Sequence, residues 1–460
     1  MRSDQRGIPL TTESDAAAAA YDETVTHYLE FRLAATPSLK KLLEADPDFA
    51  MGHCLKGFLL SGFHSVALQG KIAESLAAAE ALSQHVTWRE KASIAALAAL
   101  HRGDSIGACR IWDEILVEHP RDLLSASLHH HYSFWLGRNY GMRDGAGRLL
   151  SSWDESVPGY GFLLGMHAFG LEESGDYAAA EASARRAVEL NSDDLWAVHA
   201  LGHVFEMQGR LDEGLALLTV SPDAWADRNP MKEHLYWHLA MFALESGDHE
   251  RVLMLYDDAI FPEPNDFYLN IQNAVSILLR LELRGVDVGN RWDMLANICS
   301  GRIGDHFQSF TDTHVMIALA RRGFDIDIAR FTTSLFEFSA AAHGSVAADN
   351  ARTLTLPLSE AIAAYFKGNH QRCIERLLPI RLDYARIGAS HAQRDIFSQI
   401  LIDAAVRAGA LKLARNLLSE RLALRPRSSD SWAKFAEVLN GLEEPLAAGN
   451  TRQRAAESFH

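Results

Sequence analysis

The chain of 460 residues is 48% hydrophobic and 23% charged, proportions that are ordinary for a folded globular protein. Its formal net charge of −16 argues against nucleic-acid-binding or anionic-membrane-binding proteins, because both need a basic surface. The four cysteines form no CxxC pair, which excludes a zinc ribbon and a thioredoxin motif and disfavours a disulfide framework. No apolar run reaches about 18 residues and the first residues lack the apolar core of a signal peptide, so we expect a cytoplasmic protein without membrane association.

The N-terminal segment, residues 1–47, is expected to cap a helical array. A first helix is predicted from Asp15 to Leu33, after Thr and Ser residues that suit an N-cap, and it contains the alanine run 16–20. A second helix is predicted to begin in the run TPSLKKLL, residues 36–43, with the same kind of cap. Helix pairing is therefore predicted from the start of the chain.

Eleven glycines follow at steps of 32 to 45 residues, each at the end of an apolar helical stretch. They are Gly70, Gly103, Gly137, Gly175, Gly209, Gly247, Gly285, Gly323, Gly368, Gly409 and Gly441. A near-constant period in this range is the signature of a repeat architecture with one helix–turn–helix unit per period. Glycine suits the turn because the residue that closes the first helix leaves the right-handed helical conformation, often with positive φ.

The repeats predict the fold class. The step 175–209 spans 34 residues, which equals the tetratricopeptide length, and the small residues Ala180, Ala184 and Ala187 let two antiparallel helices approach closely. Most of the 13 prolines fall at joints between helical segments. We therefore predict an all-α protein, a right-handed superhelical α-solenoid of about eleven or twelve tetratricopeptide-like helix pairs that runs as one body over residues 1–460.

Several blocks are more specific than the repeat period. They are LEADPDFAMGH (43–53), DLWAVHALGHVFEMQGR (194–210), KEHLYWHLAMFALESGDH (232–249), TDTHVMIALARRG (311–323) and GASHAQRDIFSQILIDAAVRAG (388–409). These blocks resemble the tetratricopeptide repeat protein 38 family of bacteria and animals, and the similarity extends over nearly the whole chain. The hexapeptide SHAQRD at 390–395 is the most distinctive part. The resemblance implies a tetratricopeptide solenoid and leaves the activity open.

Histidines recur within the predicted first helices of consecutive repeats. His199 and His203 are four residues apart, and so are His234 and His238. This spacing places both rings of a pair on one helix face about 6 Å apart, which is half of a zinc site. These four residues are therefore the candidate metal ligands. No HExxH motif is present, so no cofactor is predicted and zinc is kept only as an alternative.

The groove register of tetratricopeptide proteins indicates which side chains share a face. In such proteins generally, the groove is lined by residues 13, 10, 6 and 3 positions before the turn glycine. Applied to Gly137, Gly209 and Gly247, this register places on one concave face His131, Trp196, His199, His203, Glu206, His234 and Trp237. His238 falls outside the register. The structural alternative is that each ring packs between helices and is satisfied by a neighbouring carboxylate or carbonyl.

The SHAQRD block is the second candidate site. Ser390 suits an N-cap and Asp395 an early-turn acid, which is the purely structural interpretation. In the functional interpretation, His391 and Arg394 point toward the groove and Arg394 holds a carboxylate or phosphate. Further along, the charge run from Arg415 to Arg427 is the best candidate for a local basic patch, but its interpretation as a solvated outer helix face is favoured.

Two functions fit these features. The first is an interaction or ligand-binding protein whose concave His/Trp-lined face takes a peptide, a protein segment or a small molecule. The alternative is an enzyme, a hydrolase or transferase acting on a small molecule in an enclosed groove. The candidate catalytic residues are His199, His203, His234, His391 and Asp312. The candidate ligand-binding residues are the seven concave-face residues together with His314, His391 and Arg394. The sequence does not decide between these functions and leaves the oligomeric state open.

Overall fold

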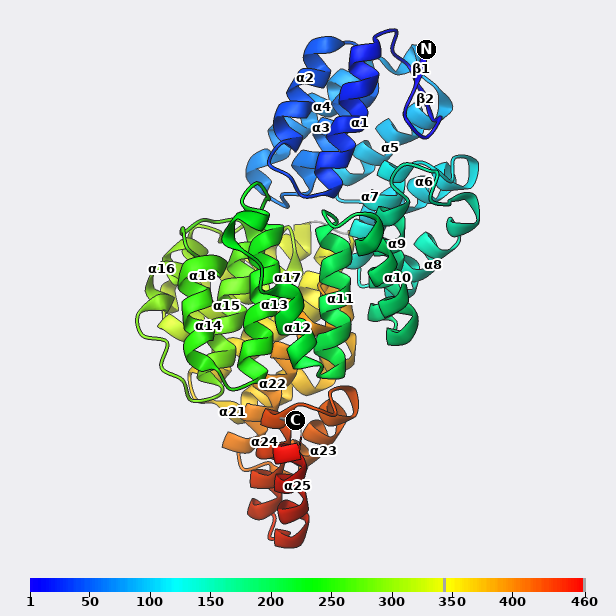
Figure 1. Cartoon of the computed structure of the whole chain (residues 1–460). Helices are drawn as coiled ribbons and strands as arrows, with labels where there is room; N and C mark the ends of the chain where they lie inside the picture. The colour runs from blue at the N-terminus through cyan, green and yellow to red at the C-terminus, as the bar shows by residue number, and fades with distance from the viewer. Residues whose placement is uncertain (342–344, 458–460) are drawn as a thin grey trace. The chain divides into compact units, whose positions relative to one another are not determined.

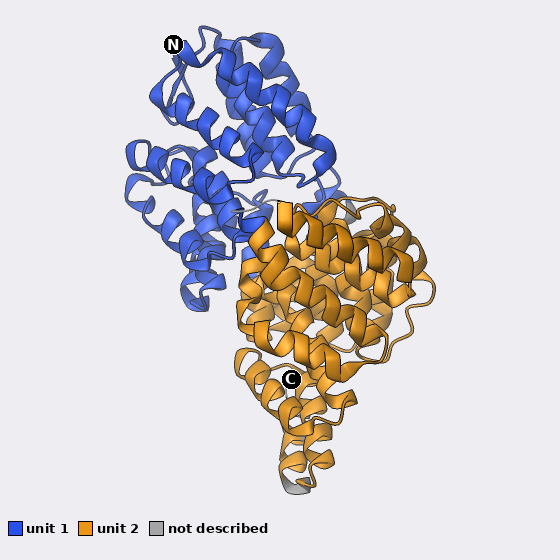
Figure 2. Ribbon diagram, turned by 180° about the vertical axis from the view of Figure 1, so that it is seen from behind, with its two compact units in different colours: residues 1–201, 221–232, 344–347 blue, residues 202–220, 233–343, 348–460 orange. Residues whose placement is uncertain are grey.

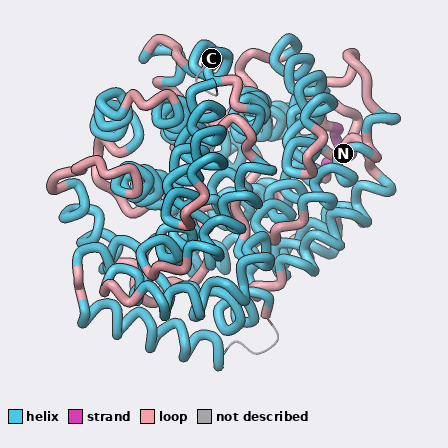
Figure 3. Tube along the Cα trace, turned by 90° about the horizontal axis from the view of Figure 1, so that it is seen from below, coloured by secondary structure: helices cyan, strands magenta, loops and turns pink. Residues whose placement is uncertain are grey.

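The computed structural model describes residues 1–341 and 345–457, and its elements are nearly all helices (Figure 3). The one sheet in this part of the chain is a short antiparallel pair near the N-terminus, β1 (Arg2–Ser3) and β2 (Pro9–Leu10). The predicted all-α fold class is confirmed.

The chain divides into two compact units (Figure 2). Unit 1 comprises residues 1–201, 221–232 and 344–347, and unit 2 comprises residues 202–220, 233–343 and 348–460. The boundary falls within the helix α11, which begins in unit 1 and ends in unit 2. The sequence predicts one continuous body over residues 1–460, and that continuity stays a prediction.

The helices of unit 1 are α1 (Asp15–Leu29), α2 (Ala35–Ala45), α3 (Ala50–Ser61), α4 (Gln69–Ala81), α5 (Trp88–His101), α6 (Ser105–Glu118), α7 (Leu123–Trp135), α8 (Asn139–Gly147), α9 (Tyr160–Glu173), α10 (Tyr177–Leu190) and the start of α11 (Leu195–Gln208) (Figure 1). Short 3₁₀ segments join them at η1 (Val66–Leu68), η2 (Ser83–His85), η3 (Leu150–Ser152) and η4 (Pro222–Trp225).

Unit 2 continues with α12 (Leu211–Leu218), α13 (Met231–Glu245), α14 (His249–Leu255), α15 (Tyr268–Glu282), α16 (Arg291–Ser300), α17 (Ser309–Arg322), α18 (Asp325–Ala341), α19 (Val346–Asn350), α20 (Leu356–Phe366), α21 (His370–Leu377), α22 (His391–Arg407), α23 (Leu411–Leu424), α24 (Ser429–Gly441) and α25 (Pro445–Glu457). It also contains two π-helical turns, η5 (Tyr256–Ile260) and η6 (Ala351–Thr355), and the 3₁₀ segment η7 (Leu378–Ile387). No helix in the described ranges is long and apolar enough to cross a membrane.

The glycine period marks the turns, as predicted. Nine of the eleven glycines, from Gly103 to Gly409, lie between two helices with φ between 66° and 84°. At Gly175 a β-carbon would meet no atom within 4 Å, so the backbone conformation and not the available space favours glycine. The other two differ, because Gly70 lies within α4 and Gly441 ends α24, where Glu443 takes the positive φ instead.

The core of unit 1 is apolar, and its long helices pack on their neighbours, for example α3 on α4 and α9 on α10. Trp112 is fully buried, and its ring lies 5.9 Å from the Phe58 ring and 5.4 Å from the Tyr132 ring, measured between centroids. The segment 221–232 is held to the rest of the unit by ion pairs of Arg228 with Asp193 and of Asp227 with Arg32.

Unit 2 closes on itself. The helix α22 packs on α21 and α23, its neighbours along the chain, and also on α15, and α15 and α22 are buried on almost every side. Beyond α23, Arg425 reaches Glu206 on α11. The later helices of unit 2 therefore cover the inner sides of its earlier ones.

This closure overturns the prediction of an open face at unit 2. His203, Glu206, His234 and Trp237 are all buried there. The groove register assigns these residues to one face of α11 and α13, and the chain's own α22 and the segment after α23 pack against that face. The concave His/Trp-lined surface is thus part of the interior of the unit.

Candidate functional site

The helix α11, which carries His199, His203 and Glu206, begins at a buried acidic cap. Asp194 Oδ1 accepts hydrogen bonds from the backbone N–H groups of Trp196 (3.0 Å) and Ala197 (3.1 Å), which satisfies two donors of the first turn. Its other oxygen, Oδ2, is buried without a hydrogen-bond partner among the described residues. Burial raises the pKa of Asp194 to about 7.

The raised pKa makes this cap costly at neutral pH. A carboxyl group whose folded pKa is raised contributes stability that is complete below the unfolded pKa of about 3.9 and is lost as the pH rises to about 7. We therefore expect Asp194→Ser, which keeps a capping oxygen without the charge, to be more stable than the wild type at pH 8 by on the order of 2–4 kcal/mol. Thermal unfolding between pH 4 and pH 8 measures this.

The matched control is Asp176→Ser at the N-cap of α10, where the carboxylate is exposed. That variant should gain nothing at pH 8. A gain that is equal at pH 4 and pH 8 for Asp194→Ser would show that the buried charge is not the cause.

Three histidines meet in the interior of unit 2, one from α11 and two from α13. The ring centroid of His203 lies 4.5 Å from that of His238, which lies 4.8 Å from that of His234. One potential ligand atom from each of the three rings lies within 4.8 Å of the others. His238 is therefore central to the cluster, and its exclusion by the groove register was wrong because α13 presents this ring to α11.

Two of these rings are oriented by hydrogen bonds through Nδ1. His238 Nδ1 donates to Glu206 Oε2 at 3.0 Å, and His234 Nδ1 contacts Asn273 Oδ1 on α15 at 2.8 Å. A carboxylate accepts only, so Nδ1 of His238 carries a proton. The Asn273 oxygen assigns the same tautomer to His234, whose pKa is lowered by burial to about 3.

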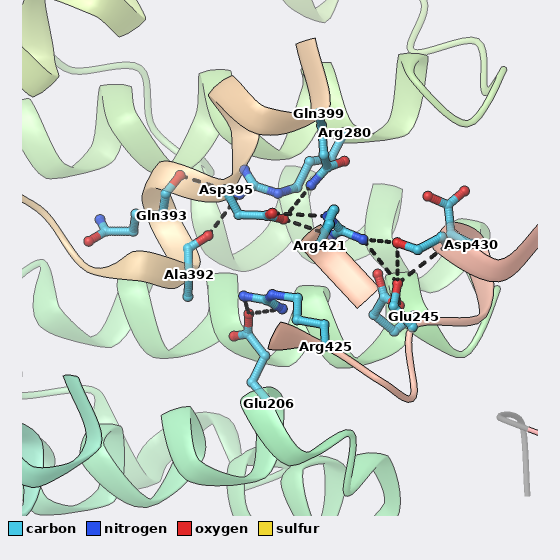
Figure 4. Close-up of polar contacts among 12 residues, drawn as sticks. Glu206, Glu245, Arg280, Ala392, Gln393, Asp395, Gln399, Arg421, Arg425 and Asp430 are labelled. Carbon is cyan, nitrogen blue, oxygen red and sulfur yellow. Dashed lines mark hydrogen bonds and ion pairs between the residues drawn. The ribbon is translucent and has the colours of Figure 1, made fainter. Parts of the chain in front are cut away.

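Glu206 links this cluster to the C-terminal part of the chain. Both terminal nitrogens of Arg425 donate to Glu206 Oε1 at 3.1 Å (Figure 4). The other oxygen, Oε2, faces His238. Burial alone would raise the pKa of Glu206, but Arg425 and His238 outweigh it and lower the pKa to about 2. Glu206 is therefore ionised and its charge is compensated by Arg425.

The SHAQRD block forms a tight helix start. Ser390 Oγ caps α22 by accepting a hydrogen bond from the Gln393 backbone N–H. The Gln393 side-chain oxygen accepts from the Ser390 backbone N–H, which completes a capping box. Arg394 Nη1 donates to the backbone oxygens of Ala389 and Gly388, which precede the cap. Arg394 is therefore held by local backbone groups, as the structural interpretation of this block predicts.

His391 lies differently from Arg394. Its ring centroid is 6.0 Å from that of His203, so the first residue of α22 adjoins the histidine cluster. Arg280 on α15 fixes this helix end by donating to the backbone oxygens of Ala392 (2.9 Å) and Gln393 (3.4 Å). The structure thus brings His391 to His203, although the two are far apart in sequence.

Next to the cluster lies a buried ionic network (Figure 4). Arg421 holds Asp395 with two hydrogen bonds, from Nε to Oδ1 at 2.9 Å and from Nη2 to Oδ2 at 2.7 Å. Arg421 also donates to Ser428, which in turn donates to Glu245, and Glu245 is paired with Arg284 at 2.6 Å. Asp395 is therefore an ion-pair partner as well as an early-turn acid.

The charge run from Arg415 to Arg427 is not a solvated face throughout. Arg421 and Arg425 are buried and bind Asp395 and Glu206. The interpretation as an outer helix face was wrong for these two residues, because Arg421 near the end of α23 and Arg425 directly after it face the interior that α22 fills.

Asp312 and His314 on α17 are held close to their own helix. Asp312 accepts a hydrogen bond from His306 (3.1 Å), and His314 Nδ1 donates to the backbone oxygen of Phe310 (2.8 Å). The His314 ring also lies 6.1 Å from the Phe397 ring of α22. Both residues are buried, and these contacts account for their positions.

The predicted site residues of unit 1 belong to an aromatic cluster. His131 stacks on His64 with a centroid separation of 5.6 Å. Trp196 Nε1 donates to His130 Nε2 at 3.1 Å, and the ring of His199 lies 4.9 Å from that of Trp196. His64 and His130 were not singled out from the sequence, since they lack the glycine register used for the others.

Unit 2 also contains two neighbouring pockets. One of them lies near the C-terminal ends of α15, α17, α20 and α22, each of which is the first helix of its repeat. The larger has a volume of about 350 Å³ and is lined by Leu279, Glu282, Leu283, Arg321, Tyr365, Phe366, Gly368, His370 and Arg407. A second pocket of about 240 Å³ shares Leu283 and includes Asp403, Asp430, Lys434 and Glu437 in its lining. We call them the turn pocket and the acidic pocket.

The cations of the turn pocket are anchored. Arg321 is paired with Glu282 at 2.9 Å, and Arg407 Nε donates to Asp403 Oδ2 at 2.5 Å. The Tyr365 hydroxyl donates to the same Asp403 oxygen. Both arginine side chains stay partly exposed, at 40% and 54%, so a ligand can reach them.

No family model matches the chain. Among solved structures, it is similar to the human IFIT1 dimer with m7Gppp-AAAA, with 13% identity, 97% of this chain and 91% of that chain covered, and a TM-score of 0.33. It is also similar to the APC/C hetero-tetramer Cut9–Hcn1, with 14% identity, coverage of 96% and 89%, and a TM-score of 0.31. These scores are too low to carry an argument about function.

The IFIT1 structure contains a capped oligonucleotide. The prediction that this chain has no nucleic-acid partner therefore gains no support from its structural neighbours and rests on net charge alone.

Proposed function

We propose that the chain is a repeat protein that binds a short extended segment of another protein across the turn pocket and the acidic pocket of unit 2. The observation that carries the proposal is the shared wall at Leu283, because it joins two pockets of opposite charge character. A cavity of about 350 Å³ lies within the size range of ligand sites, and the two together suit an extended ligand better than a compact one. This site replaces the concave His/Trp-lined face, whose unit 2 residues are buried.

The charges indicate the kind of segment. The turn pocket has an apolar wall of Leu279, Leu283 and Phe366 and two arginines against one lining glutamate, so it suits an apolar residue with a free carboxylate. The acidic pocket is lined by more acidic than basic side chains, and the acidic ones are Asp403, Asp430 and Glu437. We expect a ligand with a C-terminal carboxylate after an apolar residue, and a lysine or arginine a few residues before it.

Fluorescence anisotropy with short labelled peptides of this design tests the proposal. A peptide with a free C-terminal carboxylate should bind, and the same peptide with a C-terminal amide should bind at least tenfold more weakly, since a hydrogen bond to a charged group contributes about 1.5–3 kcal/mol. Arg407→Gln should weaken binding of the carboxylate peptide by a similar factor.

Arg330→Gln is the matched control, because Arg330 is exposed and ion-paired on α18 and does not line either pocket. It should bind like the wild type. Equal binding of the acid and amide peptides, or full affinity in Arg407→Gln, would contradict the proposal.

An enzyme acting on a small molecule is the second candidate function. It is supported by the meeting of His203, His234 and His238 with His391, four of the histidines selected from the sequence. We also propose that the chain belongs to the tetratricopeptide repeat protein 38 family, on the sequence blocks alone. Neither proposal depends on the peptide site, which uses other residues.

A further inference from the structure

We propose that His203, His234 and His238 bind a divalent transition-metal ion, and that Zn²⁺ is the ion that suits them best. The three side chains come from α11 and α13, lie within unit 2 and are buried. Zn–N bonds of about 2.1 Å place ligand nitrogens about 3.4 Å apart in a tetrahedral site, and the three nitrogens here lie within 4.8 Å of one another. Small ring rotations therefore bring them to ligand distance.

The surrounding hydrogen bonds favour a metal over simple packing. A histidine that binds a metal usually donates its other ring N–H to a carboxylate or carbonyl, which fixes the ring and makes the ligand nitrogen more basic. Glu206 and Asn273 accept from Nδ1 of His238 and His234 in this way, so both rings carry their lone pair on Nε2. Packing alone explains burial of the rings but does not require these two orientations.

The donor set selects the ion class. Three imidazole ligands suit zinc, copper, nickel or iron and do not suit Mg²⁺ or Ca²⁺, which prefer oxygen ligands. Glu206 is outside the ligand set because Arg425 and His238 already hold both of its oxygens.

Metal analysis of the chelator-treated full-length protein after reloading with ZnCl₂ tests the proposal. We expect one zinc per chain, and substitution with Co²⁺ should give the intense visible absorption of a tetrahedral nitrogen-ligated ion. His203→Gln and His238→Gln should each lower zinc affinity at least 100-fold. Glu206→Gln, which removes the carboxylate that supports His238 and pairs with Arg425, should lower it about 10–100-fold while the cobalt spectrum persists.

His306→Gln is the matched control. His306 is also buried in unit 2 and also faces a carboxylate, Asp312 at 3.1 Å, but it is not one of the three proposed ligands. Its zinc affinity should equal that of the wild type. Circular dichroism checks the fold of every variant, and if the ligand variants do not fold, the cobalt spectrum of the wild type decides.

Wild-type protein that takes up no zinc, or an octahedral cobalt spectrum, would overturn the inference. So would full affinity in a folded His238→Gln variant. The peptide experiments address different residues, so zinc binding can hold while the peptide proposal fails, and the reverse is equally distinguishable.

Discussion

Replacing Asp395 by Ala should lower the free energy of unfolding by about 3–5 kcal/mol, because it leaves the buried guanidinium of Arg421 without its counter-ion. Both side chains are nearly inaccessible, at 10% and 6% exposure, so water cannot take the place of the carboxylate. Urea unfolding followed by circular dichroism measures the change.

The double variant Asp395→Leu with Arg421→Met is the informative control. It removes both charges and keeps apolar volume, so it should recover most of the lost stability. A double variant as unstable as Asp395→Ala would show that the surrounding hydrogen bonds to Ser428 matter more than the ion pair.

The same pair should make acid unfolding steeper. Burial alone would raise the pKa of Asp395, but Arg421 and Arg425 outweigh it and hold the pKa well below its usual range. A depressed carboxyl pKa contributes stability that is present above the unfolded pKa of about 3.9 and is lost as the pH falls through the folded pKa. The double variant lacks this contribution at every pH.

Gly170→Ala should destabilise unit 1 by about 3 kcal/mol, because a methyl group at this position meets the backbone of another helix. A β-carbon on Gly170 of α9 would lie 2.4 Å from the backbone nitrogen of Arg143 on α8 and 2.6 Å from its Cα. Backbone atoms cannot rotate away as a side chain does, so the two helices have to separate. The shift of the thermal unfolding midpoint measures the effect.

Gly175→Ala provides the comparison within the same repeat. Its φ is 84° and a β-carbon there meets nothing within 4 Å, so the substitution costs only the left-handed conformation, about 1 kcal/mol. If Gly175→Ala proved the more damaging of the two, close helix approach at Gly170 would not be the dominant constraint.

The local rules of the sequence predict the repeats well. A turn glycine acts through its own φ, and Gly103 and Gly409 adopt positive φ whatever lies around them. The capping box of Ser390 with Gln393 follows in the same way from residues three apart. Such features depend only on near neighbours in the chain, and therefore they can be predicted without knowing the path of the superhelix.

The sequence offers closure only as the enclosed groove of the enzyme alternative and does not decide for it, because closure depends on the small rotations between repeats added along the unit. The groove register identifies the inward side of one helix. It does not indicate which later segment of the chain packs against that side. The residues next to Arg425 in the sequence have the composition of an ordinary protein surface, and its partner Glu206 lies 219 residues earlier. His238 was selected as a candidate metal ligand but falls outside the groove register, which does not indicate its contact with Glu206 of the preceding repeat.

The separation between Glu206 and Arg425 affects how the protein is made. In an ordinary solenoid each repeat completes its contacts with the next one. Here Glu206 on α11 is paired only when Arg425, 219 residues later, has been synthesised. At a translation rate of about 5–20 residues per second, the ribosome needs roughly 10 to 45 seconds for this stretch. During that time the glutamate and histidines have no Arg425 or α22 above them, so water must hydrate them. Assembly of this interior is therefore a late step, governed by loop closure over a long distance.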